Sequence, residues 1–131
     1  MVISNARINF FDADAAGVLF HGKYFELCHT ALESFLLSQV KYAEYFSSPE
    51  IAFPVVHSEA SYFSPLIPGD EVEIAISLIE IRNSSFGLLF KIKKVSGEVA
   101  AEIQTVTVSV EKKKWQKTAL PPFIIDLLNS L

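Results

Sequence analysis

The sequence predicts an α+β fold in which one long helix packs against an antiparallel sheet. Three observations carry this prediction: apolar residues recur at helical spacing over residues 23–39, they alternate with polar residues after residue 70, and short turns join the alternating segments. Strands joined by short turns pair as antiparallel neighbours. The chain has 131 residues, half of them hydrophobic, and we expect one domain spanning residues 1–131.

An apolar strand is expected near the N-terminus, with Ile8 and Phe10 running into a loop that holds Asp12, Asp14 and Gly17. Glycine suits a turn that needs a positive φ, and aspartate is favoured in turns and helix caps. The helix that follows places free backbone N–H groups beside a carboxylate, and such groups can polarise a carbonyl or hold an anion. The loop is therefore either a chemical site or a structural turn.

The long helix is predicted from about Lys23 to near Gln39. Its apolar stripe is wide, which favours a helix wrapped by a sheet over one lying on a surface. Residues 40–46 are predicted to form a short second helix, and Ser47-Ser48-Pro49 interrupts the chain after it. The stripe consists of Tyr24, Phe25, Leu27, Cys28, Ala31, Leu32, Phe35 and Leu36.

Three strands are predicted in the second half, over residues 71–80, 86–95 and 99–111, with turns at 83–85 and 96–97 between them. The turn Pro68-Gly69-Asp70 opens the first of these strands. In the last strand the apolar positions change from odd to even numbers near Gln104 and Thr105, which predicts a β-bulge there. Residues 120–128 are predicted to form a short helix that closes over the sheet.

Composition and charge exclude several function classes. The net charge of −4 argues against a nucleic-acid binder, which normally carries a clustered basic face. Lysines at 91, 93 and 94 and at 112–114 are either solvated or face the phosphates of a nucleotide-bearing substrate. A single cysteine excludes an intrachain disulfide, and neither a signal peptide nor a run of about 20 apolar residues is found, so we expect a cytoplasmic protein without a membrane segment.

The run from Asp12 to Glu26 reads Asp-Ala-Asp-Ala-Ala-Gly-Val-Leu-Phe-His-Gly-Lys-Tyr-Phe-Glu. It resembles the signature of the 4-hydroxybenzoyl-CoA thioesterase family, in which Asp-x-Asp-x-x-Gly and a few apolar residues precede an aromatic-rich helix start. The resemblance implies a hotdog fold, a central helix wrapped by a curved antiparallel sheet, over nearly the whole chain. It also implies a thioester hydrolase that uses neither a metal nor a cofactor.

The resemblance assigns roles to residues of the loop. Asp14 corresponds to the catalytic carboxylate of the family, and Asp12 and Gly17 hold the turn. The backbone N–H groups near His21 and Gly22 correspond to those that face the thioester carbonyl. Hydrolysis needs a nucleophile or an activated water and a stabilised oxyanion. Asp14 can attack directly or position a water, and both mechanisms remain open.

The three histidines carry different expectations. His21 lies inside the motif, and two alternatives stay open for its side chain: it contacts the substrate, or it has no contact with it. His29 lies at helical spacing from Glu26 and Glu33, and we expect a solvated or hydrogen-bonded side chain rather than a metal ligand. His57 follows Phe53-Pro54-Val55-Val56 at the start of an expected strand. We expect it to be either a core histidine or a substrate contact.

The substrate is suggested by a second resemblance. The pairs Cys28-His29 and Val56-His57 resemble positions in the subgroup of cyanobacterial 1,4-dihydroxy-2-naphthoyl-CoA hydrolases, which act in phylloquinone (vitamin K1) synthesis. This implies an aryl-CoA substrate. His21 instead resembles the general acyl-CoA thioesterases associated with the Tol-Pal system, and a non-catalytic acyl-binding protein is the third alternative. Four phenylalanines either line an aryl pocket or belong to the core: Phe20, Phe25, Phe53 and Phe63.

Partners are implied by the family rather than by particular residues. Hotdog proteins pair their sheets edge to edge, so we expect a homodimer or homotetramer in which Asp14 faces the other subunit. An acyl-CoA or aryl-CoA is the expected substrate partner, and neither a nucleic acid nor a membrane is expected.

Overall fold

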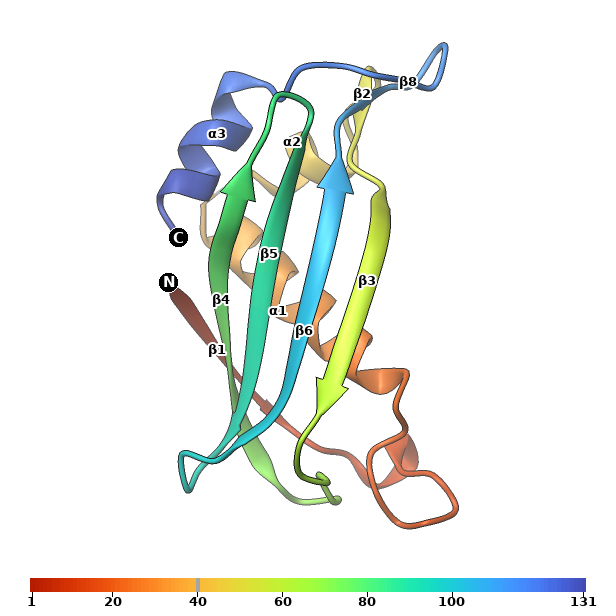
Figure 1. The fold of residues 1–131 in the computed structure, drawn as a ribbon, viewed down its shortest axis with the longest axis vertical. Helices are drawn as coiled ribbons and strands as arrows, with labels where there is room; N and C mark the ends of the chain where they lie inside the picture. The colour runs from red at the N-terminus through yellow and green to blue at the C-terminus, as the bar shows by residue number, and fades with distance from the viewer. Residues whose placement is uncertain (40) are drawn as a thin grey trace.

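The computed structural model describes residues 1–39 and 41–131. A five-stranded antiparallel sheet with the order β1-β4-β5-β6-β3 forms one layer, and β2, β7 and β8 form a small second sheet at one end (Figure 1). The helices and strands are β1 (Val2–Arg7), the 3₁₀ helix η1 (Phe10–Asp12), α1 (Lys23–Ser38), α2 (Tyr42–Phe46), β2 (Ile51–Ala52), β3 (Val55–Tyr62), β4 (Glu71–Ile81), β5 (Ser85–Lys94), β6 (Val99–Val108), β7 (Val110–Glu111), β8 (Gln116–Lys117) and α3 (Pro122–Asn129).

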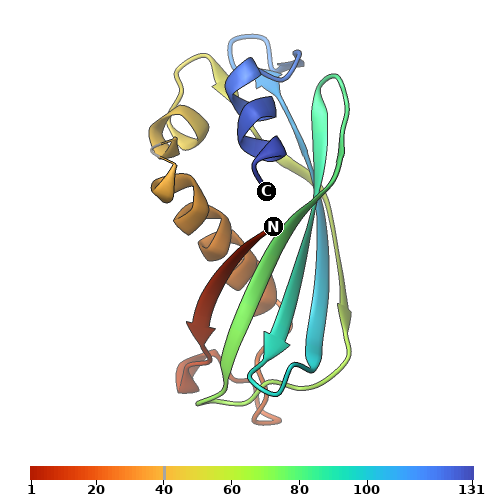
Figure 2. The ribbon, with the colours of Figure 1, turned by 90° about the vertical axis from the view of Figure 1, so that its left-hand side faces the viewer.

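The helices all lie on one side of the curved large sheet, and α1 runs along its inner face (Figure 2). This confirms the predicted α+β fold and the helix wrapped by a sheet. Burial of the apolar stripe of α1 supplies part of the stabilisation, because each fully buried large apolar side chain contributes roughly 1.5–3 kcal/mol. The buried residues of α1 are Tyr24, Cys28, Ala31, Phe35 and Leu36.

The strands predicted over residues 71–80 and 86–95 are present as β4 and β5, whereas the single strand predicted over residues 99–111 is divided at Ser109 between β6 of the large sheet and β7 of the small sheet. In β4, Val72, Ile74 and Ile76 are buried, whereas Glu71 and Glu73 are exposed. The predicted closing helix is α3, which buries Ile124, Leu127 and Leu128. No helix of the described residues is long and apolar enough to cross a membrane.

The predicted second helix is present as α2, beginning at Tyr42. Of the residues 40–46 predicted to be helical, Val40 lies outside the described residues. The interruption at 47–49 is confirmed, because no helix or strand includes those residues.

The prediction of an N-terminal strand through Ile8 and Phe10 is wrong in its end point. Strand β1 ends at Arg7, and Phe10 opens the 3₁₀ helix with its side chain 85% exposed. The Ile8 N–H donates to the Asp70 carbonyl, and the Ile8 carbonyl accepts from Gly69. These two bonds take Ile8 out of the β1–β4 ladder and attach it to the turn before β4.

The predicted β-bulge at Gln104 and Thr105 is also wrong. The β5–β6 register is continuous from Ser85 opposite Val108 to Ile92 opposite Ala101. Residue positions 101, 103, 105 and 107 therefore all face the helix side, although Thr105 and Thr107 are polar. The apolar pattern changes because these inward positions line a cavity rather than dry core, and a register shift occurs instead in β3 between Val55 and His57.

Candidate active site

The loop between η1 and α1 is held by hydrogen bonds to Asp14. One carboxylate oxygen, Oδ1, accepts from the Ala16 N–H at 2.8 Å and from the Val18 N–H at 3.4 Å. The Asp14 N–H donates to the Val18 carbonyl at 2.8 Å, and Gly17 has a φ of +80°. Among the described residues, the second oxygen, Oδ2, has no protein partner. The backbone thus fixes the direction of the carboxylate and leaves one oxygen available for chemistry.

Asp12 contacts the start of the helix instead. Its Oδ1 lies 3.6 Å from Lys23 Nζ, and its backbone carbonyl accepts from the Phe20 N–H at 3.0 Å. Lys23 also pairs with Glu26 at 2.9 Å, and these acidic neighbours, Glu26 first, raise the pKa of Lys23. These contacts tie both ends of the loop together.

A pocket of about 330 Å³ opens beside this loop. Asp14 and His21 contribute from the loop, Tyr24 from α1, and Tyr62 from the end of β3. Ser64, on the segment after β3, also lines the pocket and accepts a hydrogen bond from Lys94 Nζ at 2.7 Å. The fold therefore brings Asp14 and His21 together. It also places the charged Lys94 side chain next to the pocket, where it is hydrogen-bonded to Ser64.

Tyr62 fixes the backbone at the start of α1. Its hydroxyl donates to the His21 carbonyl at 3.0 Å, and its ring packs edge-on against Tyr24 with centroids 4.8 Å apart. The His21 carbonyl and the Gly22 N–H belong to one planar peptide unit and point in opposite directions. The bond from Tyr62 therefore orients the Gly22 N–H and strengthens it as a donor.

Gly22 is the residue that precedes α1, and it has little space for a side chain. A Cβ atom there would lie 2.9 Å from the Phe20 ring. The Phe20 ring also packs against His21, with ring centroids 4.3 Å apart. These contacts hold the peptide at the helix start close to the pocket that contains Asp14.

The other two histidines lie outside this pocket. His29 pairs with Glu33 at 3.0 Å and packs against Phe46, as expected for a hydrogen-bonded polar side chain. His57 is 61% exposed, so the core alternative is wrong for it. It lies opposite Val106 on the outer face of the sheet, because Ser58, its neighbour, faces the helix. The structure does not bring His57 together with Asp14.

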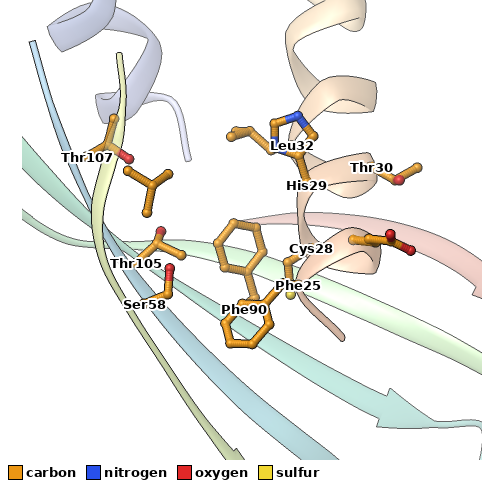
Figure 3. A pocket seen from close by; sticks show the side chains of 11 residues that line it. Phe25, Cys28, His29, Thr30, Leu32, Ser58, Phe90, Thr105 and Thr107 are labelled. Atoms are coloured by element: carbon orange, nitrogen blue, oxygen red, sulfur yellow. The ribbon is translucent and has the colours of Figure 1, made fainter. Parts of the chain in front are cut away.

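A larger cavity of about 560 Å³ lies between α1 and strands β3, β5 and β6 (Figure 3). Phe25, His29 and Leu32 form the helix wall, and Phe90 projects from the sheet between the walls. The hydroxyl side chains of Ser58, Thr105 and Thr107 line the opposite wall. The cavity is therefore mainly apolar, with hydrogen-bonding groups on one side.

Cys28 also lines this cavity, but it is a poor nucleophile. Burial raises the pKa of its thiol to about 12, so the thiol stays protonated near neutral pH. Of the four phenylalanines considered from sequence, Phe25 lines the larger cavity and Phe63 the Asp14 pocket. Phe53 instead stacks on Tyr45 with ring centroids 4.7 Å apart.

Sequence reasoning missed Tyr62, Ser58 and the two threonines of the cavity. Tyr62 and His21 are 41 positions apart, so no local pattern connects them. The threonines did leave a signal, since the break in apolar alternation near Thr105 marks the cavity wall.

The family model of the thioesterase-like superfamily matches residues 8–128. The chain belongs to this superfamily, and it is a thioester hydrolase with the hotdog fold.

Individual relatives agree with this assignment. The chain is 32% identical over 131 residues to a 1,4-dihydroxy-2-naphthoyl-CoA hydrolase of Gloeothece citriformis, covering 98% of this chain and 92% of the relative. It is 38% identical over 124 residues to an enzyme of the same name from Prochlorococcus marinus, covering 88% and 82%. A 1,4-dihydroxy-2-naphthoyl-CoA thioesterase from Synechocystis has the same fold, with a TM-score of 0.87, 24% identity and coverage of 98% and 96%.

Proposed function

We propose that this protein hydrolyses an aryl-CoA thioester, and that the substrate is 1,4-dihydroxy-2-naphthoyl-CoA, giving 1,4-dihydroxy-2-naphthoate for phylloquinone synthesis. The observation that carries the proposal is the cavity beside α1, whose apolar rings face a wall of hydroxyl groups. Its volume of about 560 Å³ lies in the usual range of small-molecule sites. A flat ring with hydroxyl substituents needs apolar contact on its faces and polar partners at its edge. The names of the relatives at 32% and 38% identity support the same substrate.

The pocket beside the cavity supplies the groups for hydrolysis. Asp14 Oδ2 either attacks the thioester carbonyl, giving an acyl–Asp14 anhydride that water then hydrolyses, or takes a proton from a water that attacks the carbonyl. Both routes use the same free oxygen. The Gly22 N–H, oriented through Tyr62, donates to the oxyanion that develops on the carbonyl oxygen. The sulfur of CoA leaves as a thiolate. Neither a metal nor a cofactor takes part in this scheme.

The two cavities follow one another along α1 and β3. Tyr24 lines the Asp14 pocket and its neighbour Phe25 lines the larger cavity, while Tyr62 and Ser58 lie on the same face of β3. A substrate with its carbonyl at Asp14 therefore directs its ring along the seam between helix and strand. The CoA portion extends toward the rim, where Lys94 lies behind Ser64.

An aliphatic acyl-CoA thioesterase is the second candidate, favoured by His21 in the Asp14 pocket. The hydroxyl wall argues against it, since an alkyl chain would leave Ser58 and Thr105 without partners. We also propose that the chain works as a homodimer or homotetramer, as expected for hotdog proteins.

The test is release of CoA by purified protein from dihydroxynaphthoyl-CoA, hydroxybenzoyl-CoA, benzoyl-CoA and aliphatic acyl-CoAs. Preference for the naphthoyl thioester, lost in Asp14→Asn, supports the proposal. Preference for aliphatic chains moves the assignment to the second candidate, and no turnover of any thioester contradicts both.

A further inference from the structure

The hairpin of β7 and β8, residues 110–117, concentrates positive charge on a chain whose net charge is −4. Four of the eleven basic side chains of the chain lie within its residues 112–117. Among residues 1–39 and 41–131, none of these four ammonium groups pairs with a carboxylate, whereas Lys23, Lys41, Lys91 and Lys94 all do. The four lysines of this basic hairpin are Lys112, Lys113, Lys114 and Lys117.

The single acid of the basic hairpin, Glu111, folds the turn instead of neutralising the lysines. Its Oε1 accepts from the Lys113 N–H and its Oε2 from the Lys114 N–H, each at 2.9 Å. Both carboxylate oxygens are therefore engaged by the backbone of the turn. Residues 112–117 are all exposed, so the turn presents the lysine side chains to solvent.

Trp115 stands at the end of this turn in an unfavourable backbone conformation. Its φ is +53°, and it is the one non-glycine residue with a positive φ among the described residues. Bulky residues rarely adopt this region, and such strain persists mainly where the residue has a use. The ring borders a hollow of about 270 Å³ together with Phe46 and Phe53, and 60% of the residue is exposed. The backbone thus presents the single tryptophan of the chain beside the lysines.

The basic hairpin is remote from the Asp14 pocket. It pairs with β2, just before β3 begins, whereas the pocket includes Tyr62 at the end of β3. A strand of eight residues such as β3 separates its ends by roughly 23 Å. Figure 1 shows the hairpin projecting at one end of the sheet and the loop before α1 at the other. The hairpin therefore has no part in the hydrolytic site of its own chain.

We propose that the basic hairpin docks on an anionic lipid surface, with the Trp115 ring among the headgroups and the four lysines against their phosphates. Tryptophan favours the interface between membrane and water, and lysines near an anionic leaflet are attracted to it. Reversible membrane binding usually needs two such signals, and the hairpin combines them in one turn. This mode needs no membrane-spanning segment.

Charge favours a lipid surface over a nucleic acid. Because the hairpin projects from the body (Figure 1), it can touch a flat surface while the acidic remainder of the chain stays farther away. Repulsion between exposed like charges falls off over about 8–10 Å in physiological salt. A nucleic-acid site normally carries a wider basic face, which the four lysines of a single turn do not provide.

Vesicle binding tests the proposal directly. In co-sedimentation over a lipid titration, we expect at least about tenfold stronger binding to phosphatidylglycerol than to phosphatidylcholine vesicles, and weaker binding as salt is added. Trp115 is the only tryptophan, so its fluorescence reports on the hairpin alone. With phosphatidylglycerol vesicles its emission is expected to move to shorter wavelength and to be quenched less by acrylamide.

Removing the lysine charges tests their part. Because each lysine near an anionic surface contributes about fivefold, replacing three of them is expected to weaken binding to phosphatidylglycerol vesicles about 100-fold. A control with the same net charge should lose less than about threefold, since its substitutions lie outside the hairpin. The test variant combines Lys112→Gln, Lys113→Gln and Lys114→Gln, and the control combines Lys41→Gln, Lys91→Gln and Lys93→Gln.

Trp115→Asn separates membrane contact from a structural role. Asparagine tolerates the left-handed region, so we expect the urea midpoint to stay the same or rise. Binding to phosphatidylglycerol vesicles is expected to weaken at least about threefold, because the interfacial ring is lost. A lower midpoint with unchanged vesicle binding would assign Trp115 to stability alone.

Four outcomes would overturn the proposal. They are equal binding to both lipids, absence of binding to phosphatidylglycerol, an equal loss in the control variant, and tighter binding to a single-stranded oligonucleotide than to the vesicles. Without vesicles, KM for the thioester is expected to be unchanged in the triple hairpin variant. A raised KM would assign the lysines to the phosphates of the substrate and also overturn the proposal. The vesicle readouts involve no hydrolysis, so they stand whether or not the proposed function does.

Discussion

The Asp14 pocket and the larger cavity lie along the same helix, but their geometry is held in different ways. In the pocket, backbone groups hold the key atoms: Asp14 Oδ1 accepts from two N–H groups, and the His21 carbonyl accepts from Tyr62. In the cavity, side chains from α1, β3, β5 and β6 meet across open space. The comparison teaches that substitutions among the side chains of the cavity can change which acyl group is accepted, while the groups of the Asp14 pocket stay the same. It also predicts that variants of the pocket change rate, whereas variants of the cavity change substrate preference.

The largest effect is expected for Asp14→Asn, which keeps the shape of the side chain and removes its basic oxygen. We expect kcat/KM for every accepted thioester to fall on the order of 10²–10⁴-fold, because a positioned acid or base contributes that much. CoA release measures the effect. Asp12→Asn, which alters the contacts of Asp12 with Lys23 and Asn9, is the control and should lose less than about tenfold. Equal losses in both variants would contradict the assignment of Asp14.

Gly17→Ala is expected to destabilise the loop. Gly17 has a φ of +80° with open space around its Cβ position, so the cost comes from backbone conformation alone. Placing a side chain in this region costs about 1–2 kcal/mol. Urea denaturation should detect this change in the free energy of unfolding. Gly17→Asn should cost less, since asparagine tolerates the left-handed region, and an unchanged stability in Gly17→Ala would contradict the turn geometry.

Tyr62→Phe removes the hydroxyl that orients the Gly22 peptide and leaves the ring against Tyr24. One hydrogen bond is worth about 1 kcal/mol, so we expect kcat to fall about fivefold with KM nearly constant. Steady-state kinetics on two thioesters of different acyl group checks this. A loss confined to one substrate would mean that Tyr62 acts on the acyl group rather than on the helix start.

Thr105→Val removes one hydroxyl from the cavity wall at constant shape. We expect the ratio of kcat/KM for dihydroxynaphthoyl-CoA to that for benzoyl-CoA to fall about fivefold, because one hydrogen bond to the ring is lost. Thr107→Val is the companion variant on the same wall, and a smaller fall is expected there because Thr107 is buried. A ratio unchanged in Thr105→Val would indicate that the ring does not reach this wall.

Most of the fold was predictable because its signals are local. The helical spacing after Lys23 and the alternation in β4 depend on residues within a few positions of each other. The two errors arose where tertiary contacts override such patterns. Ile8 leaves the strand because it bonds to the turn at Asp70, and Thr105 faces inward because a cavity accepts its hydroxyl.

The sequence by itself determined the fold class, the Asp14 loop and the superfamily, since each depends on contiguous residues. Only the tertiary structure decided that Tyr62 reaches His21, that hydroxyls of β3 and β6 share one cavity, and that His57 faces away from both. The physical reason is strand register. Strand register decides which residues far apart in sequence become neighbours, and it assigns each side chain to a face of the sheet. Local spacing in the sequence specifies neither of these two outcomes.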